Sequence, residues 1–186
     1  MLQLHPITTA SAAHYAYMEQ LLLAAFPADE YRDLQALRDF TDNNPLFHNN
    51  LLLHQDTPIG LLTYWDFDTF CYVEHFAIDP ALRNAGWGAR ALALLKAQLR
   101  RPVVLEVELP VDELTRRRVS FYQRQGFELW PNPYWQPPYR PTDDYLPMRI
   151  MACGSLSSQH DFEQVKHRIY TEVYHCLPSS DANSKP

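Results

Sequence analysis

The stretch Phe76–Ala89, which reads FAIDPALRNAGWGA, decides the fold that we expect for this chain. A strand pattern ends at Asp79-Pro80, a short loop carries Gly86 and Gly88, and a strong helical pattern follows. The first turn of a helix offers unpaired backbone N–H groups at the positive end of the helix dipole. Glycines let an anion approach that backbone closely. The stretch therefore predicts an anion-binding turn between a strand and a helix.

The surroundings of this turn favour the same reading. The 186 residues include only 5 glycines, and two of them lie in the turn. Residues 81–105 contain five basic side chains and no acidic one. The spacing is not GxGxxG followed by a ribose-binding acid, which makes a dinucleotide site less favoured. It is not GxxxxGK[ST] either, so a P-loop is excluded.

Composition limits the class of protein. With 46% hydrophobic and 20% charged residues, the chain can bury a sizeable core and is not disordered as a whole. No apolar run approaches the roughly 20 residues that span a bilayer, and no secretory signal pattern is visible, so we expect no membrane partner. Three widely separated cysteines predict neither a disulfide framework nor a metal site, and they favour a reducing cytoplasm. A net charge of −6 argues against nucleic acid as a partner.

Periodicity predicts an α+β fold. The expected strands are 3–7, 50–54, 59–65, 70–78, 103–109, 127–130 and 146–152, and the expected helices are 11–25, 32–41, 88–101, 115–125 and 162–176. We expect Ser11 to cap the first helix, Gly126 to close the fourth, and Ser158 with Asp161 to form a capping box for the last. Six prolines between 131 and 147 predict a stiff aromatic loop or a broken hairpin, without a regular element.

Two separated motifs resemble those of the GNAT N-acetyltransferase family. Arg83-Asn84-Ala85-Gly86-Trp87-Gly88 is similar to its acetyl-CoA signature R/Q-x-x-G-x-G/A, and residues 121–127, FYQRQGF, match its F-Y-x-x-x-G-F motif. Residues 72–78 resemble the family's fourth strand. The resemblance covers about residues 2–152 and implies a mixed, mainly antiparallel central sheet flanked by helices, with the coenzyme wedged between the fourth and fifth strands.

The resemblance, the helical spacing of residues 162–176 and the polar end of the chain together predict three parts. We expect a GNAT-like acetyltransferase domain over residues 1–152, then an extra C-terminal amphipathic helix within 153–177, then a disordered tail over 178–186. The helix would dock on its own domain or on a second subunit, and the second case would give a homodimer.

Residue roles follow from the resemblance position by position. It implies that the backbone of Phe76, Ala77 and Ile78 binds the pantetheine arm. The turn that would hold the pyrophosphate comprises Arg83, Asn84, Ala85, Gly86, Trp87, Gly88 and Ala89. Glu74 matches a carboxylate that some members use as general base, and Tyr122 matches the tyrosine near the thioester sulfur. Thr115 stands where the family often has an asparagine that contacts the pantetheine.

Elementary chemistry supports the two catalytic candidates. An alkylamine has a pKa near 10 and is mostly protonated at neutral pH, so a base must help it to attack a thioester. On a strand, Glu74 would share a face with Phe76 and Ile78, and a partly apolar face should raise its pKa. Tyr122 can protonate the leaving thiolate. Two plainer readings stay open: Glu74 as a salt-bridge partner at the rim, and Tyr122 as a core aromatic. His75 would lie on the opposite strand face and pack.

The sequence identifies the residues that would bind the acceptor amine less clearly than those that would bind the coenzyme. The candidate residues are Phe26, Glu30 and Tyr31 between the first two helices, and Tyr134 and Trp135 in the proline-rich segment. Residues 29–79 carry ten acidic side chains against two arginines, which suits a cationic amine, and aromatic rings suit cation–π contact. We therefore expect an acetyl-CoA-dependent N-acetyltransferase acting on a small-molecule or peptide amine. The alternative is a non-catalytic acyl-CoA-binding or regulatory module on the same fold.

Overall fold

A computed structural model describes residues 1–176 of the chain. The described chain forms two compact units, a first unit that ends at Arg101 and a second unit that begins at Pro102. The tail that the sequence predicts over 178–186 lies outside the described residues.

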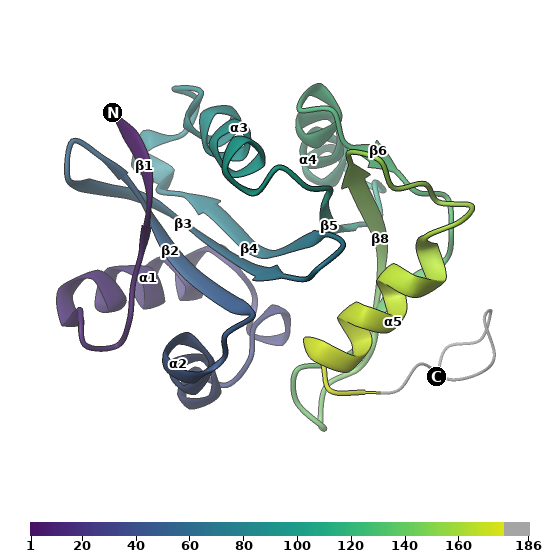
Figure 1. Cartoon of the computed structure of the whole chain (residues 1–186), viewed down its shortest axis with the longest axis horizontal. Coiled ribbons are helices and arrows are strands. Elements are labelled where there is room, and N and C mark those ends of the chain that lie inside the picture. The colour runs from purple at the N-terminus through teal and green to yellow at the C-terminus, as the bar shows by residue number, and fades with distance from the viewer. Residues whose placement is uncertain (177–186) are drawn as a thin grey trace. The chain divides into compact units, whose positions relative to one another are not determined.

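The first unit is an antiparallel sheet with three α-helices (Figure 1). Its strands are β1 (Leu2–Pro6), β2 (Phe47–His54), β3 (Thr57–Asp66) and β4 (Cys71–Ile78), paired in that order. Its α-helices are α1 (Ala12–Ala25), α2 (Leu34–Asn43) and α3 (Trp87–Leu99), with short 3-10 turns at Ala28–Glu30 and Pro80–Leu82. In Figure 1, α1 and α2 lie on one side of these strands and α3 on the other. The predicted elements are confirmed, with small shifts at their ends.

A tight turn joins β2 to β3. Gln55 and Asp56 both adopt positive φ, 50° and 63°, as a two-residue hairpin turn requires. Gly60 follows in β3, where a Cβ atom would lie only 2.5 Å from the carbonyl oxygen of Ala77 in β4. Close approach of two strands thus accounts for Gly60, a position for which the sequence offers no explanation.

A β-bulge in β4 corrects the predicted faces of this strand. Thr63 of β3 pairs with His75 and Tyr64 pairs with Val73, so Glu74 is an extra residue on β4. The Glu74 carboxylate bonds to Trp65, and His75 bonds to the hydroxyl of Thr63. Because Thr63 and Trp65 are alternate residues of β3, they share a face, and Glu74 and His75 lie on it together.

The face prediction was therefore wrong for three residues. Ile78 lies opposite Gly60, and its side chain approaches the position that a Gly60 Cβ would occupy, on the other face of the sheet. Phe76 follows His75 directly, so its side chain points to the opposite face from His75 and lies on the same face as Ile78. His75 does not lie opposite Glu74, because the bulge shifts the alternation by one residue.

The second unit contains the remaining elements. Its strands are β5 (Val103–Glu108), β6 (Glu128–Leu129), β7 (Tyr134–Gln136) and β8 (Leu146–Cys153), and β8 pairs antiparallel with each of the other three. Its helices are α4 (Glu113–Arg124) and α5 (Phe162–Glu172). Strand β7 corrects the expectation that no regular element forms between 131 and 147. Its three residues avoid the prolines on either side, since Pro133 precedes them and Pro137 follows.

The helix ends confirm one prediction and correct two. Gly126 has φ of +84° just after α4, where its N–H bonds to the carbonyl of Gln123 and the N–H of Phe127 to that of Tyr122. These two bonds form a Schellman motif, so the predicted glycine stop is confirmed. Ser11 occupies the N-cap position of α1 without a side-chain cap bond, and Asp161, with none either, is the N-cap of α5. The expected capping box at Ser158 is therefore wrong.

Helix α5 packs on its own unit. Its apolar face buries Phe162, Val165, Ile169 and Tyr170. The ring of Phe162 meets Trp130 edge-on at 6.3 Å, and that of Tyr170 meets Tyr134 at 5.8 Å.

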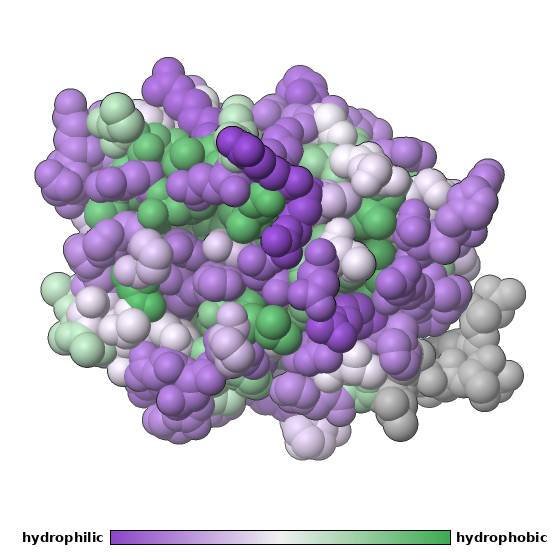
Figure 2. All heavy atoms as spheres, in the orientation of Figure 1, coloured by the Kyte–Doolittle hydropathy of each residue, from purple (hydrophilic) through white to green (hydrophobic). Residues whose placement is uncertain are grey.

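On the face seen in Figure 2, hydrophilic side chains separate the apolar areas from one another. Both units combine helices with antiparallel strands, so the predicted α+β, mainly antiparallel class is confirmed.

Candidate active site

The turn between β4 and α3 has the geometry of an anion site. Asn84 and Gly86 adopt positive φ, 65° and 77°, and all residues from Arg83 to Gly86 are exposed. Gly86 is the N-cap of α3 and supplies no side-chain cap, so the N–H groups of the first helical turn have no side-chain acceptor there. Such N–H groups, together with the helix dipole, favour a bound anion.

Side chains around this turn add charge and shape. The Arg90 guanidinium lies over the ring of Trp87, 5.0 Å from the ring centre. The ring of His54 also packs against Trp87, with the two ring centres 4.5 Å apart. The side chain of Arg83 donates to the carbonyl of Ile78 at 3.2 Å, which ties the turn to the end of β4. The residues present thus fit a phosphate group of a coenzyme.

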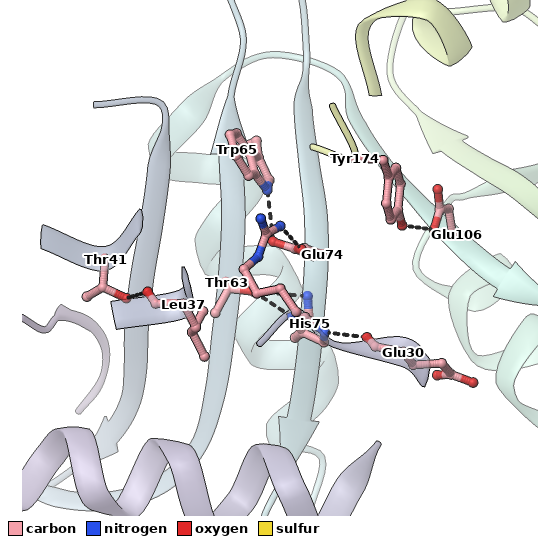
Figure 3. A network of polar contacts seen from close by, with 10 residues as sticks. Glu30, Leu37, Thr41, Thr63, Trp65, Glu74, His75, Glu106 and Tyr174 are labelled. Carbon is pink, nitrogen blue, oxygen red and sulfur yellow. Dashed lines mark hydrogen bonds and ion pairs between the residues drawn. The ribbon is translucent and has the colours of Figure 1, made fainter. Parts of the chain in front are cut away.

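Glu74 is part of a buried ion pair (Figure 3). Its side chain is 0% exposed and that of Arg32 is 5% exposed, and the two are joined by a short hydrogen bond from the guanidinium. The indole N–H of Trp65 donates to the second carboxylate oxygen at 2.8 Å. The guanidinium also lies over Phe40 at 4.5 Å. The alternative prediction of Glu74 as a salt-bridge partner at the rim is thus half right: the salt bridge is present, but Glu74 is buried and does not lie at the rim.

The electrostatics of Glu74 differ from the expectation. Burial by itself raises the pKa of Glu74, but the Arg32 guanidinium, the neighbouring His75 and the hydrogen bonds from Arg32 and Trp65 together hold that pKa below its usual value. The predicted raised pKa is therefore wrong, because the sequence does not reveal that Arg32 folds onto this carboxylate.

His75 packs and forms hydrogen bonds, as predicted, but it does so on the same strand face as Glu74 and not on the opposite one. Its imidazole Nε2 contacts the carbonyl of Glu30 at 2.8 Å, Nδ1 contacts the hydroxyl of Thr63 at 3.3 Å, and the ring meets Phe26 at 4.8 Å. Burial lowers the pKa of His75 below its usual value. The pair Glu74 and His75 thus anchors the 26–32 segment to the sheet.

Tyr122 lies in the second unit, on the buried side of α4. Its ring meets Phe121 at 5.2 Å and Phe127 at 5.6 Å, both edge-on. Burial raises the pKa of Tyr122 to about 12, so its hydroxyl keeps its proton at neutral pH. Tyr122 therefore has a buried aromatic ring, and its hydroxyl is neutral at neutral pH, so it can donate a proton or accept a hydrogen bond.

Thr115 forms the capping box that starts α4. Its hydroxyl donates to the Asp112 carboxylate at 2.9 Å and accepts from the Asp112 N–H at 3.1 Å, while its own N–H donates to the same carboxylate at 2.8 Å. The donor capacity of this hydroxyl is engaged by the cap. A contact from Thr115 to the coenzyme stays a prediction.

The predicted acceptor residues divide between the two units. Phe26, Glu30 and Tyr31 are partly exposed in the segment that His75 anchors. Tyr134 is 1% exposed and its hydroxyl makes a short hydrogen bond to Glu106. Trp135 is partly exposed, and its carbonyl accepts from the hydroxyl of Tyr170. Each unit therefore brings together one of the two predicted groups.

Sequence reasoning missed Glu106 of β5. Its two carboxylate oxygens accept from the hydroxyls of Tyr134 and Tyr174, the latter at 2.8 Å and drawn in Figure 3. The three residues are far apart in the chain, so no local motif joins them. The available signal was an acidic residue inside the apolar strand pattern VVLEVEL, where burial makes a charge costly.

Comparison with known proteins identifies the family. Residues 14–127, more than half of the chain, match the Acetyltransferase (GNAT) family. The chain belongs to this family. A Bacteroides thetaiotaomicron protein of solved structure, provisionally assigned as a GNAT acetyltransferase, is 52% identical; the match covers 94% of this chain and 99% of that one, with a TM-score of 0.91. The predicted family and acetyltransferase class are confirmed.

Two further relatives add detail. The Bacillus subtilis (strain 168) protein YjbC, provisionally named an acetyltransferase, is 31% identical over 109 residues, which are 55% of this chain and 52% of that protein. The chain thus spans about half the length of this curated relative. A GNAT family acetyltransferase from Elizabethkingia anophelis, solved with acetyl-CoA bound, shares the fold at 16% identity and a TM-score of 0.55, over 83% of this chain and 98% of that one.

The described residues contain neither a cluster of metal-binding side chains nor a helix that could span a membrane. Among residues 1–176, no group of His, Cys, Asp and Glu side chains is arranged to hold a metal ion. None of the helices in that range is both long and apolar enough to cross a membrane.

Proposed function

We propose that this GNAT family member transfers the acetyl group of acetyl-CoA to an amine by direct attack of that amine on the thioester. The observation that carries the proposal is the turn Arg83–Ala89, which is exposed from Arg83 to Gly86 and combines two left-handed residues with a helix start that has no side-chain cap. Acetyl-CoA would supply an activated acetyl group and a thiolate leaving group.

The chain's own residues would divide the work. The turn and Arg83 would bind the pyrophosphate through backbone N–H groups and charge, and the backbone of Phe76, Ala77 and Ile78 would align the pantetheine arm. Tyr122, whose raised pKa of about 12 keeps it protonated throughout the neutral range, would give its proton to the leaving sulfur. The ammonium form of the acceptor would lose a proton to solvent before attack, and the acetylated nitrogen would then return its extra proton to the Tyr122 oxygen. Phe26, Glu30, Tyr31, Tyr134 and Trp135 stay the predicted acceptor residues, and the acceptor is a small-molecule or peptide amine.

We assign Glu74 a structural role in place of the predicted base. A carboxylate that is 0% exposed and already bonded by Arg32 and Trp65 has no face to offer an incoming amine. We also propose a cytoplasmic location, which fits the absence of a disulfide at Cys71, Cys153 and Cys176 within residues 1–176. Metal ions and nucleic acids have no part in the proposal.

Isothermal titration calorimetry and thiol release test the proposal together. The chain should bind acetyl-CoA, and it should release free thiol faster with a panel of primary amines, which includes spermidine and an alanine-initiated peptide, than without them. Binding without amine-dependent thiol release would favour the alternative, a non-catalytic acyl-CoA-binding or regulatory module. Absence of acetyl-CoA binding would refute both.

A further inference from the structure

The carboxylate of Asp79 holds the start of the chain segment that leads from β4 to α3. Asp79 is the first residue after the strand, and its backbone N–H donates to the carbonyl of Ile59 in β3 at 2.9 Å. Its carboxylate oxygen Oδ1 accepts from the N–H of Ala81 at 2.9 Å and so caps the 3-10 turn Pro80–Leu82. Arg83 follows this turn directly. The path by which the chain leaves the sheet therefore depends on how Asp79 is oriented.

A tyrosine of helix α1 holds the second oxygen of the same carboxylate. The hydroxyl of Tyr17 donates to Asp79 Oδ2 at 3.2 Å, and both side chains are half-buried. Helix α1 lies on the opposite side of the strands from α3 (Figure 1). The bond from Tyr17 thus ties the segment that precedes α3 to the helix on the other face of the sheet, within the first unit.

The direction of this hydrogen bond is fixed by the state of the tyrosine. Burial raises the pKa of Tyr17 to about 12, and the charge of Asp79 and the hydrogen bond to it act in the same direction. The hydroxyl therefore keeps its proton at neutral pH and serves as the donor. A hydrogen bond to an ionised carboxylate is stronger than one between neutral groups, so it is well suited to hold the carboxylate in one orientation.

The charge of Asp79 alone does not favour the proposed use of the neighbouring turn. A carboxylate close to a bound pyrophosphate repels it. The geometry can outweigh that cost, because a turn that is ordered in the free protein loses less conformational freedom when its ligand binds. The turn contains the left-handed residues Asn84 and Gly86, which have other accessible conformations unless the chain before them is fixed.

We propose that Tyr17 is a positioning residue for coenzyme binding: through Asp79 it orders the turn Arg83–Ala89 before the pyrophosphate arrives. The proposal rests on the proposed function, since it concerns the turn that would bind the coenzyme there. In this role Tyr17 acts on the affinity for the coenzyme and not on the chemical step.

Calorimetric titration with coenzyme A tests this role in Tyr17→Phe, which removes the hydroxyl and keeps the ring. The binding-competent turn would be populated for a smaller fraction of the time, so the Kd for coenzyme A should rise about 3- to 30-fold. The KM for acetyl-CoA should rise in parallel, while kcat stays within about twofold. Tyr64→Phe is the matched control and should leave Kd unchanged. Tyr64 is also half-buried, with a pKa that burial raises to about 12, but it pairs with Val73, towards the end of β4 that is remote from the turn.

A second substitution shows whether the hydroxyl acts through Asp79. Asp79→Ser keeps an oxygen that can cap the N–H of Ala81, but the shorter side chain has no second oxygen for Tyr17. Adding Tyr17→Phe to Asp79→Ser should therefore change the Kd for coenzyme A by less than about twofold, since the contact is already absent. An equal loss of affinity from Tyr17→Phe in both backgrounds overturns the inference.

The remaining outcomes separate this inference from the proposed function. If Tyr17→Phe lowers the free energy of unfolding in urea but leaves the Kd for coenzyme A unchanged, the hydroxyl is only structural and the inference is wrong. A fall in kcat with an unchanged KM for acetyl-CoA also overturns it. In both cases coenzyme binding by the unaltered chain leaves the proposed function standing. If the unaltered chain does not bind coenzyme A, the proposed function fails and the inference fails with it.

Discussion

The buried pair Arg32–Glu74 yields a quantitative prediction about stability. Substituting Arg32→Met keeps a long side chain beside Phe40 and Trp65 but removes the charge that lies 4.5 Å and 5.5 Å from their ring centres. The Glu74 carboxylate, 0% exposed, would then be buried without its cation. Removing one partner of such a pair costs about 3–5 kcal/mol of unfolding free energy. Urea unfolding at neutral pH, followed by circular dichroism, measures this loss.

The pH dependence gives the prediction its sign. In the unaltered chain the pKa of Glu74 is lowered, so the pair contributes stability above the unfolded-state pKa of about 4.3 and loses it as pH falls through the lower folded value. In Arg32→Met the burial that opposes ionisation dominates, and the folded pKa of Glu74 lies above about 4.3. The loss of unfolding free energy in Arg32→Met, relative to the unaltered chain, should therefore shrink as the pH falls from neutral towards the raised folded pKa of Glu74.

A double variant isolates the charge. Glu74→Gln added to Arg32→Met removes the unpaired charge but leaves an oxygen for the Trp65 indole N–H, which donates at 2.8 Å in the unaltered chain. The double variant should be more stable than Arg32→Met alone. A deficit below about 1 kcal/mol for Arg32→Met, the value typical of exposed pairs, or a deficit independent of pH, would refute the reasoning.

Three further outcomes are expected. Tyr122→Phe should lower kcat about 100-fold with unchanged acetyl-CoA affinity by calorimetry, because it removes the protonated hydroxyl that we propose as the proton donor to the leaving sulfur; an unchanged kcat contradicts this. Gly86→Ala should cost about 1–2 kcal/mol from its φ of +77° and weaken acetyl-CoA binding, whereas Gly126→Ala, at φ of +84°, should bring similar strain without the affinity loss. Ile169→Ala, at a 0% exposed position of α5, should cost about 2–5 kcal/mol in urea unfolding, against almost nothing for the exposed His167→Ala.

The regular elements could be predicted because their patterns are local. The stripe Phe162, Val165 and Ile169 has helical spacing, and the structure buries all three. The turn at Gly86 and the stop at Gly126 were readable because a positive φ favours glycine. Strand β7 was missed because proline density argues against a strand, while only three residues are needed to pair with β8.

The site was less predictable because it depends on register and on distant contacts. The bulge at Glu74 arises from how β4 pairs with β3, and a single extra residue reverses every face after it. The partner of Glu74 is Arg32, which comes from a loop segment with no signal for that contact. Glu106 likewise meets Tyr134 and Tyr174 only after folding.

The two hydroxyls on Glu106 have a practical consequence for how this enzyme is divided or shortened. The family match ends at residue 127, while Tyr134 and Tyr174 both lie beyond it. A protein trimmed to the matched region would retain the turn Arg83–Ala89 and Tyr122 but lose both donors. Relatives that agree closely within that region can therefore differ in how this carboxylate of β5 is held, and sequence comparisons confined to the family match would not detect the difference.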